Sequence, residues 1–157
     1  MEKILISACF LGEKVRYDGN SQRLTSSLIH MWQQQGRLVS LCPEVFGGLA
    51  IPRQPAEIQQ ESGQVLTCTD QDVTQQFFKG ANQALALCQK FDIRYALMKE
   101  SSPSCGSTSI YDGTFTQTKI SGEGITSALL RKNGIQVFSE KQINALAKML
   151  DELSSQP

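Results

Sequence analysis

The sequence has no surplus of charge of either sign, because its 15 Lys and Arg residues balance its 15 Asp and Glu residues. A domain that binds nucleic acid through bulk electrostatics carries a basic surface, so this balance argues against a nucleic-acid partner. The sequence also lacks an apolar run of the length that crosses a membrane. Composition therefore argues against both nucleic acid and a membrane as partners.

Closely spaced cysteine pairs are also absent. The five cysteines are odd in number and irregularly spaced, and none forms a Cys-x2-Cys pair. This pattern disfavours a secreted disulfide scaffold and suits the reducing cytoplasm, where we expect the protein to act. Residues 6–9 (Ile-Ser-Ala-Cys) resemble a lipoprotein cleavage site, but the apolar residues 4–6 are too few for a signal sequence.

The length of 157 residues is that of one domain with a substantial core, so we expect a single domain over residues 1–157. The end from Ser154 to Pro157 is expected to fray. Short apolar runs predict strands, and apolar residues at helical spacing predict helices. The expected strands are residues 3–8, 37–41, 94–98 and 135–138, and the expected helices are residues 21–35, 72–90, 124–132 and a last helix capped by Ser139 with Gln142.

Alternation of strands and helices predicts an α/β fold, a single three-layer Rossmann-like domain with a mainly parallel sheet. Three further segments complete the prediction. Residues 42–58 form a long irregular loop, because three prolines and a Gly-Gly pair interrupt any regular element. Residues 64–68 are expected to form a short edge strand paired with Ile58. Residues 109–115 are expected to form a turn around Asp-Gly.

Three cysteines stand just after predicted strands: Cys9, Cys42 and Cys105. In parallel sheets, the carboxyl ends of the strands share one edge, and ligands bind there. We therefore expect these thiols to meet at one site. Cys88 lies on the apolar face of a predicted helix and is expected to be a core residue, while Cys68 has no assigned role.

Three thiolates could bind zinc, but zinc sites usually contain a local pair of ligands. An iron–sulfur cluster fits dispersed thiolates better, and three cysteines would leave one iron without a protein ligand. Such an iron is a Lewis acid that favours a soft sulfur atom. The one histidine, His30, falls on a predicted helix and is expected to be a surface or packing residue rather than a fourth ligand.

Several motifs together resemble the TudS-type thiouracil desulfidase family over nearly the whole chain. They are Ser-Ala-Cys-Phe-Leu-Gly at 7–12, Arg-Tyr-Asp-Gly at 16–19, Cys-Pro-Glu at 42–44, Gly-Gly-Leu at 47–49, Pro-Arg at 52–53 and Ser-Pro-Ser-Cys-Gly at 102–106. The resemblance implies a [4Fe–4S] cluster held by the three cysteines that match Cys9, Cys42 and Cys105. It also implies that the open iron takes the sulfur of the substrate, so that the C–S bond is hydrolysed without net redox change.

Polar residues near these cysteines are candidates for catalysis. Glu44 is the candidate for proton transfer, with loop pairing to Arg53 or Arg16 as its alternative role. Ser102 and Ser101 could hydrogen-bond the substrate or relay a proton, or make ordinary turn bonds.

Residues on two further loops are candidates for binding the substrate. Arg16, Asp18 and Arg53 could orient a pyrimidine-like ring through hydrogen bonds, or could brace the loops around the cluster. The expected substrate is a small thiolated molecule such as 2-thiouracil. A different thio-metabolite or thiolated nucleoside, a non-catalytic iron–sulfur redox-sensing module and an iron-free persulfide carrier are the alternatives.

Overall fold

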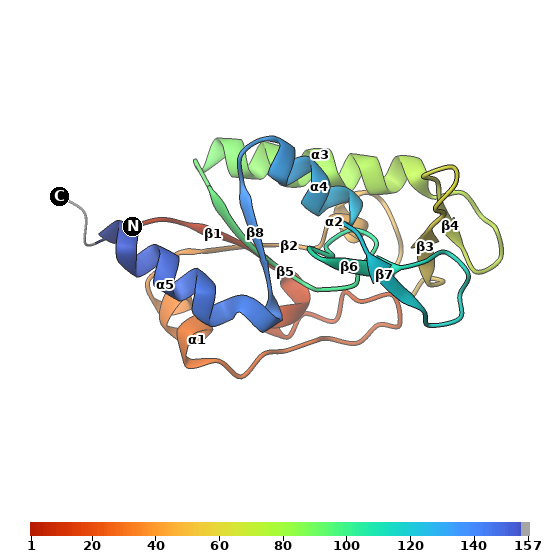
Figure 1. Cartoon of the computed structure of the whole chain (residues 1–157). Coiled ribbons are helices and arrows are strands. Elements are labelled where there is room, and N and C mark those ends of the chain that lie inside the picture. The colour runs from red at the N-terminus through yellow and green to blue at the C-terminus, as the bar shows by residue number, and fades with distance from the viewer. Residues whose placement is uncertain (155–157) are drawn as a thin grey trace.

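The computed structural model describes residues 1–154 and is built on a four-stranded sheet in the order β2-β1-β5-β8 (Figure 1). The strands are β1 (Ile4–Ser7), β2 (Leu38–Leu41), β5 (Tyr95–Met98) and β8 (Gln136–Ser139). All of them run parallel, and Ile4 lies opposite Leu38 on one side and Tyr95 on the other. The expected α/β class and parallel sheet are therefore confirmed.

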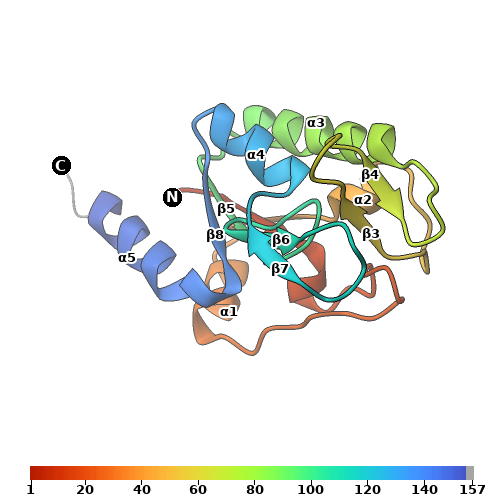
Figure 2. The same cartoon turned by 45° about the vertical axis from the view of Figure 1, so that its right-hand side comes forward.

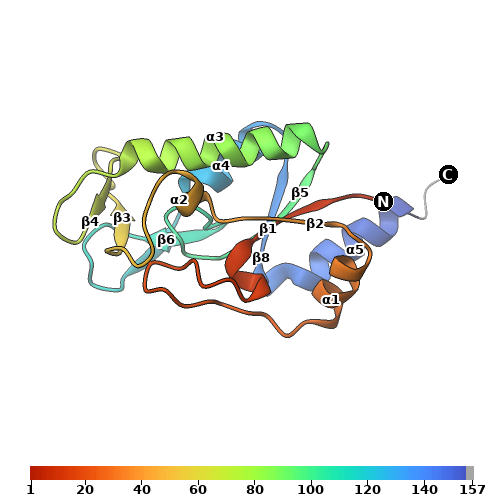
Figure 3. The ribbon, with the colours of Figure 1, turned by 180° about the vertical axis from the view of Figure 1, so that it is seen from behind.

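Helices cover both faces of this sheet. The α3 helix (Thr74–Lys90) and the α4 helix (Ile125–Lys132) lie on one face, and α1 (Ser27–Gln34) and α5 (Ile143–Ser154) lie on the other (Figures 1 and 3). Three layers result, because a sheet with two apolar faces must bury both. None of the helices within residues 1–154 has the length and apolar character needed to span a bilayer.

A small buried cluster of Val65, Val73 and Phe77 lies between β4 (Val65–Thr67) and the start of α3, and the sheet separates the two larger clusters. Leu5 on β1 packs with Ala84 of α3 and Leu130 of α4, whereas its neighbour Ile4 packs with Trp32 of α1 and with α5. Successive side chains of a strand point to opposite faces, so β1 supplies both clusters and is buried throughout. Each such aliphatic side chain stabilises the fold by about 1.5–3 kcal/mol on burial.

The first helix begins later than the expected start at residue 21. Residues 21–26 are extended, and Ser26 caps the helix by accepting a hydrogen bond from the backbone N–H of Ile29. Gln22 and Leu24 instead donate their backbone N–H groups to the turn that follows β1. Periodicity placed Leu24 on the helix because an extended segment also presents an apolar side chain to the core.

Most of the remaining predictions are confirmed. The long helix occupies α3, and β4 (Val65–Thr67) pairs with β3 (Ala56–Ile58) with Ile58 opposite Val65. The capping box of Ser139 and Gln142 is present, although it begins a short 3-10 turn, η2 (Glu140–Gln142), that leads into α5. The end from Ser154 onward was expected to fray; Ser154 closes α5, and residues 155–157 lie outside the described residues.

Small elements gather beyond the carboxyl edge of the sheet (Figure 2). The loop expected over residues 42–58 contains a one-turn helix and β3, and the turn expected at 109–115 belongs to a hairpin. The elements are η1 (Ala8–Leu11), α2 (Pro43–Phe46), the β3–β4 hairpin, and the hairpin of β6 (Ser109–Tyr111) and β7 (Lys119–Ser121). Their backbone pairing is local, so they form separate two-stranded sheets.

The α2 turn lies directly against α3 because two glycines leave no side chain between them. A Cβ atom on Gly80 would overlap the carbonyl oxygen of Pro43, and one on Gly47 would overlap the carbonyl oxygen of Gln76. This close approach sets the position of α2 and hence of Cys42, which immediately precedes it.

Replacement of Gly80 by Ala tests this contact. In an ordinary helix the change stabilises by about 1 kcal/mol, but here we expect a loss of about 1–3 kcal/mol from the overlap with Pro43. Urea denaturation measures the difference. Gln83→Ala, at an exposed position of α3, is the matched control and should leave stability nearly unchanged. A Gly80→Ala variant at least as stable as the wild type would contradict the close packing.

Candidate functional site

A cavity of about 510 Å³ opens at the carboxyl edge of the sheet, and Cys9, Cys42 and Cys105 all line it. They follow three adjacent strands in the order β2-β1-β5. Cys9 lies in the η1 turn after β1, and Cys42 is the residue between β2 and α2. Cys105 lies on the loop between β5 and β6. The structure thus brings together the three thiols that strand ends predicted to meet.

Each of these thiols is free, and each is held in its neutral form by its surroundings. Burial raises the pKa of Cys9 to about 11, with a further contribution from the nearby Cys42. Burial also raises the pKa of Cys42, although backbone N–H groups of α2 oppose it. The pKa of Cys105 is raised most strongly, by burial and by the neighbouring Cys42 and Glu44. Thiolates at these positions require a positively charged group to compensate their burial.

The donor set fits a group larger than a single ion. Among residues 1–154, no three His, Cys, Asp or Glu side chains are arranged to hold one metal ion. A cluster of several irons takes thiolate ligands that stand farther apart than those of one ion. Three soft sulfur donors with no nearby histidine are the ligand chemistry of iron–sulfur clusters rather than of hard cations.

Glu44 lies beside the thiols and contacts two polar partners. Its Oε1 atom pairs with Nε of Arg53 at 3.2 Å, and its Oε2 atom accepts a hydrogen bond from Oγ of Ser102 at 3.5 Å. Its side chain is 17% exposed, and burial raises the pKa of this carboxyl although Arg53 and Ser102 lower it. A carboxyl with a raised pKa next to a reaction site is suited to proton transfer.

Three neighbouring groups determine the direction in which the Ser102 hydroxyl donates its proton. Its Oγ atom accepts from the backbone N–H groups of Ser104 and Cys105, each at 3.1 Å. A hydroxyl has one proton to donate, and with the oxygen occupied by two donors that proton points to Glu44. The Ser102 hydroxyl is therefore fixed between the backbone at Ser104 and Cys105 and the carboxylate of Glu44.

Ser101 belongs to a different set of contacts. Its Oγ atom hydrogen-bonds Oγ of Ser109 at 2.9 Å, and its backbone φ of 67° lies in the left-handed region. Although Ser101 lines the cavity, the described contacts of its hydroxyl lead away from Glu44. The geometry distinguishes two serines that the sequence had left equivalent.

The three candidates for substrate binding occupy different places. Arg16 and Arg53 line the cavity, and Asp18 does not. The carboxylate of Asp18 is exposed and accepts a hydrogen bond from the backbone N–H of Asn20 in its own turn. Arg53 also donates to backbone carbonyl oxygens of Val15 and Ala50, so it braces two loops while it holds Glu44.

The other singled-out residues lie as expected. Cys88 on α3 is 1% exposed and belongs to the buried cluster between α3 and the sheet, which confirms a core role. His30 is exposed on α1. Cys68, to which the sequence assigned no role, is an exposed thiol that also lines the cavity.

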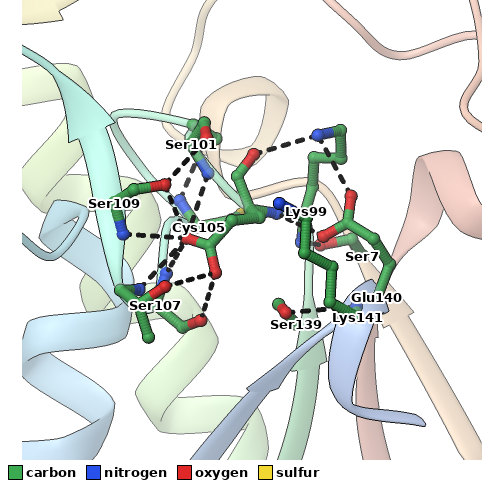
Figure 4. Close-up of polar contacts among 12 residues, drawn as sticks. Ser7, Lys99, Ser101, Cys105, Ser107, Ser109, Ser139, Glu140 and Lys141 are labelled. Atoms are coloured by element: carbon green, nitrogen blue, oxygen red, sulfur yellow. Dashed lines mark hydrogen bonds and ion pairs between the residues drawn. The ribbon is translucent and has the colours of Figure 1, made fainter. Parts of the chain in front are cut away.

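Sequence reasoning missed several residues that line the cavity. They come from the end of β5 and from the two hairpins, and they are Lys99, Glu100, Glu57, Tyr111, Phe115, Gln117 and Lys119. Figure 4 shows polar contacts in the segment that carries Cys105, with Ser101, Ser107 and Ser109 on one side and Lys99 and Glu140 on the other. A glutamate followed by a run of hydroxyl residues was the available signal for Glu100.

Together, fold and site define a parallel α/β domain with a cavity of three thiols and an adjoining carboxylate. The family model for 2-thiouracil desulfurase matches residues 4–142. The chain therefore belongs to the 2-thiouracil desulfurase family, and the resemblance drawn from its motifs is confirmed.

Two similar proteins extend this result. "Uncharacterized protein YbbK" of Bacillus subtilis (strain 168) is 38% identical over 149 residues, which cover 90% of this chain and 97% of that protein. A solved structure described as the [4Fe-4S]-dependent thiouracil desulfidase TudS is 52% identical, with a TM-score of 0.93. The match covers 96% of this chain and 99% of that one.

Proposed function

We propose that this protein is a [4Fe–4S]-dependent thiouracil desulfidase. The reaction is the hydrolysis of the thiocarbonyl of 2-thiouracil, in which water supplies the oxygen of uracil and the sulfur leaves as hydrogen sulfide. Oxygen replaces sulfur on the same carbon, so no electron donor or acceptor is needed. The observation that carries the proposal is that Cys9, Cys42 and Cys105 line one cavity beside the Glu44–Ser102 pair.

The three cysteines are the proposed ligands of the cluster, at the carboxyl ends of the parallel strands. When bound, the cluster supplies one iron without a protein ligand, a Lewis acid with affinity for sulfur. We interpret the strand order β2-β1-β5-β8 as a Rossmann-like arrangement, in which this edge is the usual place for ligands. The free thiols suit the reducing cytoplasm, where we place the enzyme.

Glu44 is the proposed general base. Its Oε2 atom faces Ser102 rather than Arg53, and this atom can accept a proton from the attacking water. Arg53 holds Oε1 and so fixes the direction in which Oε2 points. Ser102 orients the carboxylate through its single proton and does not need to ionise. Ser101, which bonds Ser109, is left with a role in the loop.

Arg16 is the proposed contact for the pyrimidine ring, since its guanidinium can donate paired hydrogen bonds and Arg53 is already occupied. The two hairpins contribute further side chains to the same cavity, among them Tyr111 and Phe115. Aromatic rings stack on nucleobases, so these side chains are suited to a flat heterocyclic substrate. Asp18 is left outside the site.

Turnover of 2-thiouracil is the direct test. With anaerobically reconstituted protein we expect equal amounts of uracil and sulfide, measured by chromatography and by a sulfide assay. A panel with 4-thiouracil and thiolated nucleosides identifies the preferred substrate. Equal turnover by iron-free protein would favour a persulfide carrier, and a loaded protein that acts on no thio-compound would favour a redox sensor.

The ligand assignment is tested by Cys9→Ala, Cys42→Ala and Cys105→Ala. We expect each variant to lose most of its iron and acid-labile sulfide after anaerobic reconstitution, because only two of the three proposed thiolate ligands remain. Cys68→Ser and Cys88→Ala are the matched controls and should keep the iron content of the wild type. Full iron and sulfide in any of the first three variants would show that the assignment is wrong.

The roles of Glu44 and Ser102 are tested with the cluster in place. Glu44→Gln should keep its iron and lose about 10²–10⁴-fold in kcat, the usual contribution of a general base. Ser102→Ala should lose about tenfold, the effect of one hydrogen bond to a charged group. Ser101→Ala is the matched control and should change kcat much less. Unchanged turnover in Glu44→Gln would remove this carboxylate from the mechanism.

A further inference from the structure

Glu100 is a buried carboxylate that the proposed reaction does not use. It is 5% exposed and stands at the end of β5, just before the loop that carries Ser102 and Cys105. Within residues 1–154, its carboxylate forms no ion pair with Lys or Arg. A buried charge without a cation is costly unless hydrogen bonds satisfy it.

The loop itself supplies those hydrogen bonds. The Oε1 atom accepts from four backbone N–H groups at 2.9–3.2 Å, and Oε2 accepts from two hydroxyl groups at 2.8 and 3.0 Å. The N–H donors belong to Ser101, Ser107, Thr108 and Ser109, and the hydroxyl donors to Ser107 and Thr108. Figure 4 shows these bonds converging from Ser101, Ser107 and Ser109. The loop therefore wraps around one anion and closes on itself.

This arrangement keeps the carboxylate ionised. Burial raises the pKa of Glu100, but the hydrogen bonds from the loop outweigh it and lower the pKa to about 2. Hydrogen bonds to a charged acceptor are about twice as strong as those between neutral groups. The charge of Glu100 thus strengthens every contact that shapes the loop.

The backbone of Glu100 is fixed from the opposite side. Its N–H donates to Oε1 of Glu140 at 2.8 Å, and Lys99 pairs with Oε2 of the same carboxylate at 3.1 Å. The backbone N–H of Lys99 donates to Oγ of Ser7 on β1. The backbone at Glu100 is therefore tied to β1 and to the η2 turn that precedes α5.

The loop is also held at its middle. Ser127 of α4 donates a hydrogen bond to the carbonyl oxygen of Cys105 at 2.8 Å, and Ser104 bonds Thr126 at 2.8 Å. The contacts of α4 hold the tip of the loop, and Glu100 holds both of its ends. With the ends and the tip fixed, Ser102 and Cys105 have little freedom to move.

We propose that Glu100 is a positioning residue, an anionic anchor that shapes residues 101–109 so that Cys105 is presented to the cluster and Ser102 to Glu44. The inference rests on the proposed function for its consequence in catalysis, but the shape of the loop can be measured without substrate or cluster. Glu100 is not catalytic, because its carboxylate contacts the loop.

Two substitutions separate the charge of Glu100 from its shape. Glu100→Gln keeps an oxygen for the four backbone N–H groups, and its amide can face the two hydroxyl groups, which rotate to accept. Glu100→Ala removes all of these acceptors and leaves buried donors unpaired. Glu57→Gln is the matched control. Glu57 is 8% exposed, lines the same cavity and accepts backbone N–H groups of Gly113 and Phe115 in another loop.

Hydrogen–deuterium exchange of iron-free protein is the first measurement. We expect Glu100→Gln to speed exchange across residues 101–109 by at least about tenfold, since the charge-assisted bonds weaken. Glu57→Gln should leave this segment unchanged and speed exchange near residue 113 instead. Wild-type exchange over 101–109 in Glu100→Gln would overturn the proposal, and this variant decides the matter if Glu100→Ala does not fold.

The second measurement follows the cluster and the reaction. We expect Glu100→Gln to keep its iron, to show an altered electron paramagnetic resonance spectrum after one-electron reduction of the cluster, and to lose kcat with KM nearly unchanged. A merely structural residue would leave the spectrum of the loaded protein as it is, and that result would overturn the positioning role. If the wild type fails to turn over any thio-compound, the proposed function fails, whereas exchange and spectrum still test Glu100.

Discussion

The parallel pairing of β2, β1 and β5 is the constraint on which the rest of the structure depends. Parallel strands place their carboxyl ends at one edge, so the segments that follow them must share the space beyond it. Cys9, Cys42 and Cys105 follow these three strands, and no contact between distant loops is needed to bring them together. The buried β1 strand holds this edge in register with both neighbours.

Buried polar groups then give the edge its chemistry. The carboxylates of Glu44, Glu57 and Glu100 each accept hydrogen bonds from a different part of the cavity wall. Hydrogen bonds to these three carboxyl groups hold the loops in place. The same low exposure that makes hydrogen bonds to them strong also raises the pKa of the three thiols. Under the proposed function, the positive charge of the iron–sulfur core would compensate the burial of these three sulfur atoms as thiolates.

Prediction from the sequence succeeded where a local pattern of apolar residues is compatible with only one kind of secondary structure. Apolar runs located all four strands of the main sheet, and helical spacing located α3 and α5. It failed at the start of α1, where Leu24 contributes to the core from an extended segment. It also failed to distinguish the role of Ser101 from that of Ser102, because the two are adjacent residues of the same type. Which hydroxyl faces Glu44 depends on how the loop winds around Glu100, a contact that no periodicity records.

The sequence by itself determined the class of fold, the family and the fact that three cysteines meet at one edge of the sheet. Strand ends and short motifs can be recognised from the local order of residues along the chain. The tertiary structure alone decided the surroundings of those thiols: Arg53 pairs with Glu44, Asp18 is not among the residues that line the cavity, and residues of two hairpins are. These depend on long-range packing of α2 against α3 and of the loops around buried carboxylates. Such contacts join residues far apart in the chain, so their energies have no signature in any single stretch of it.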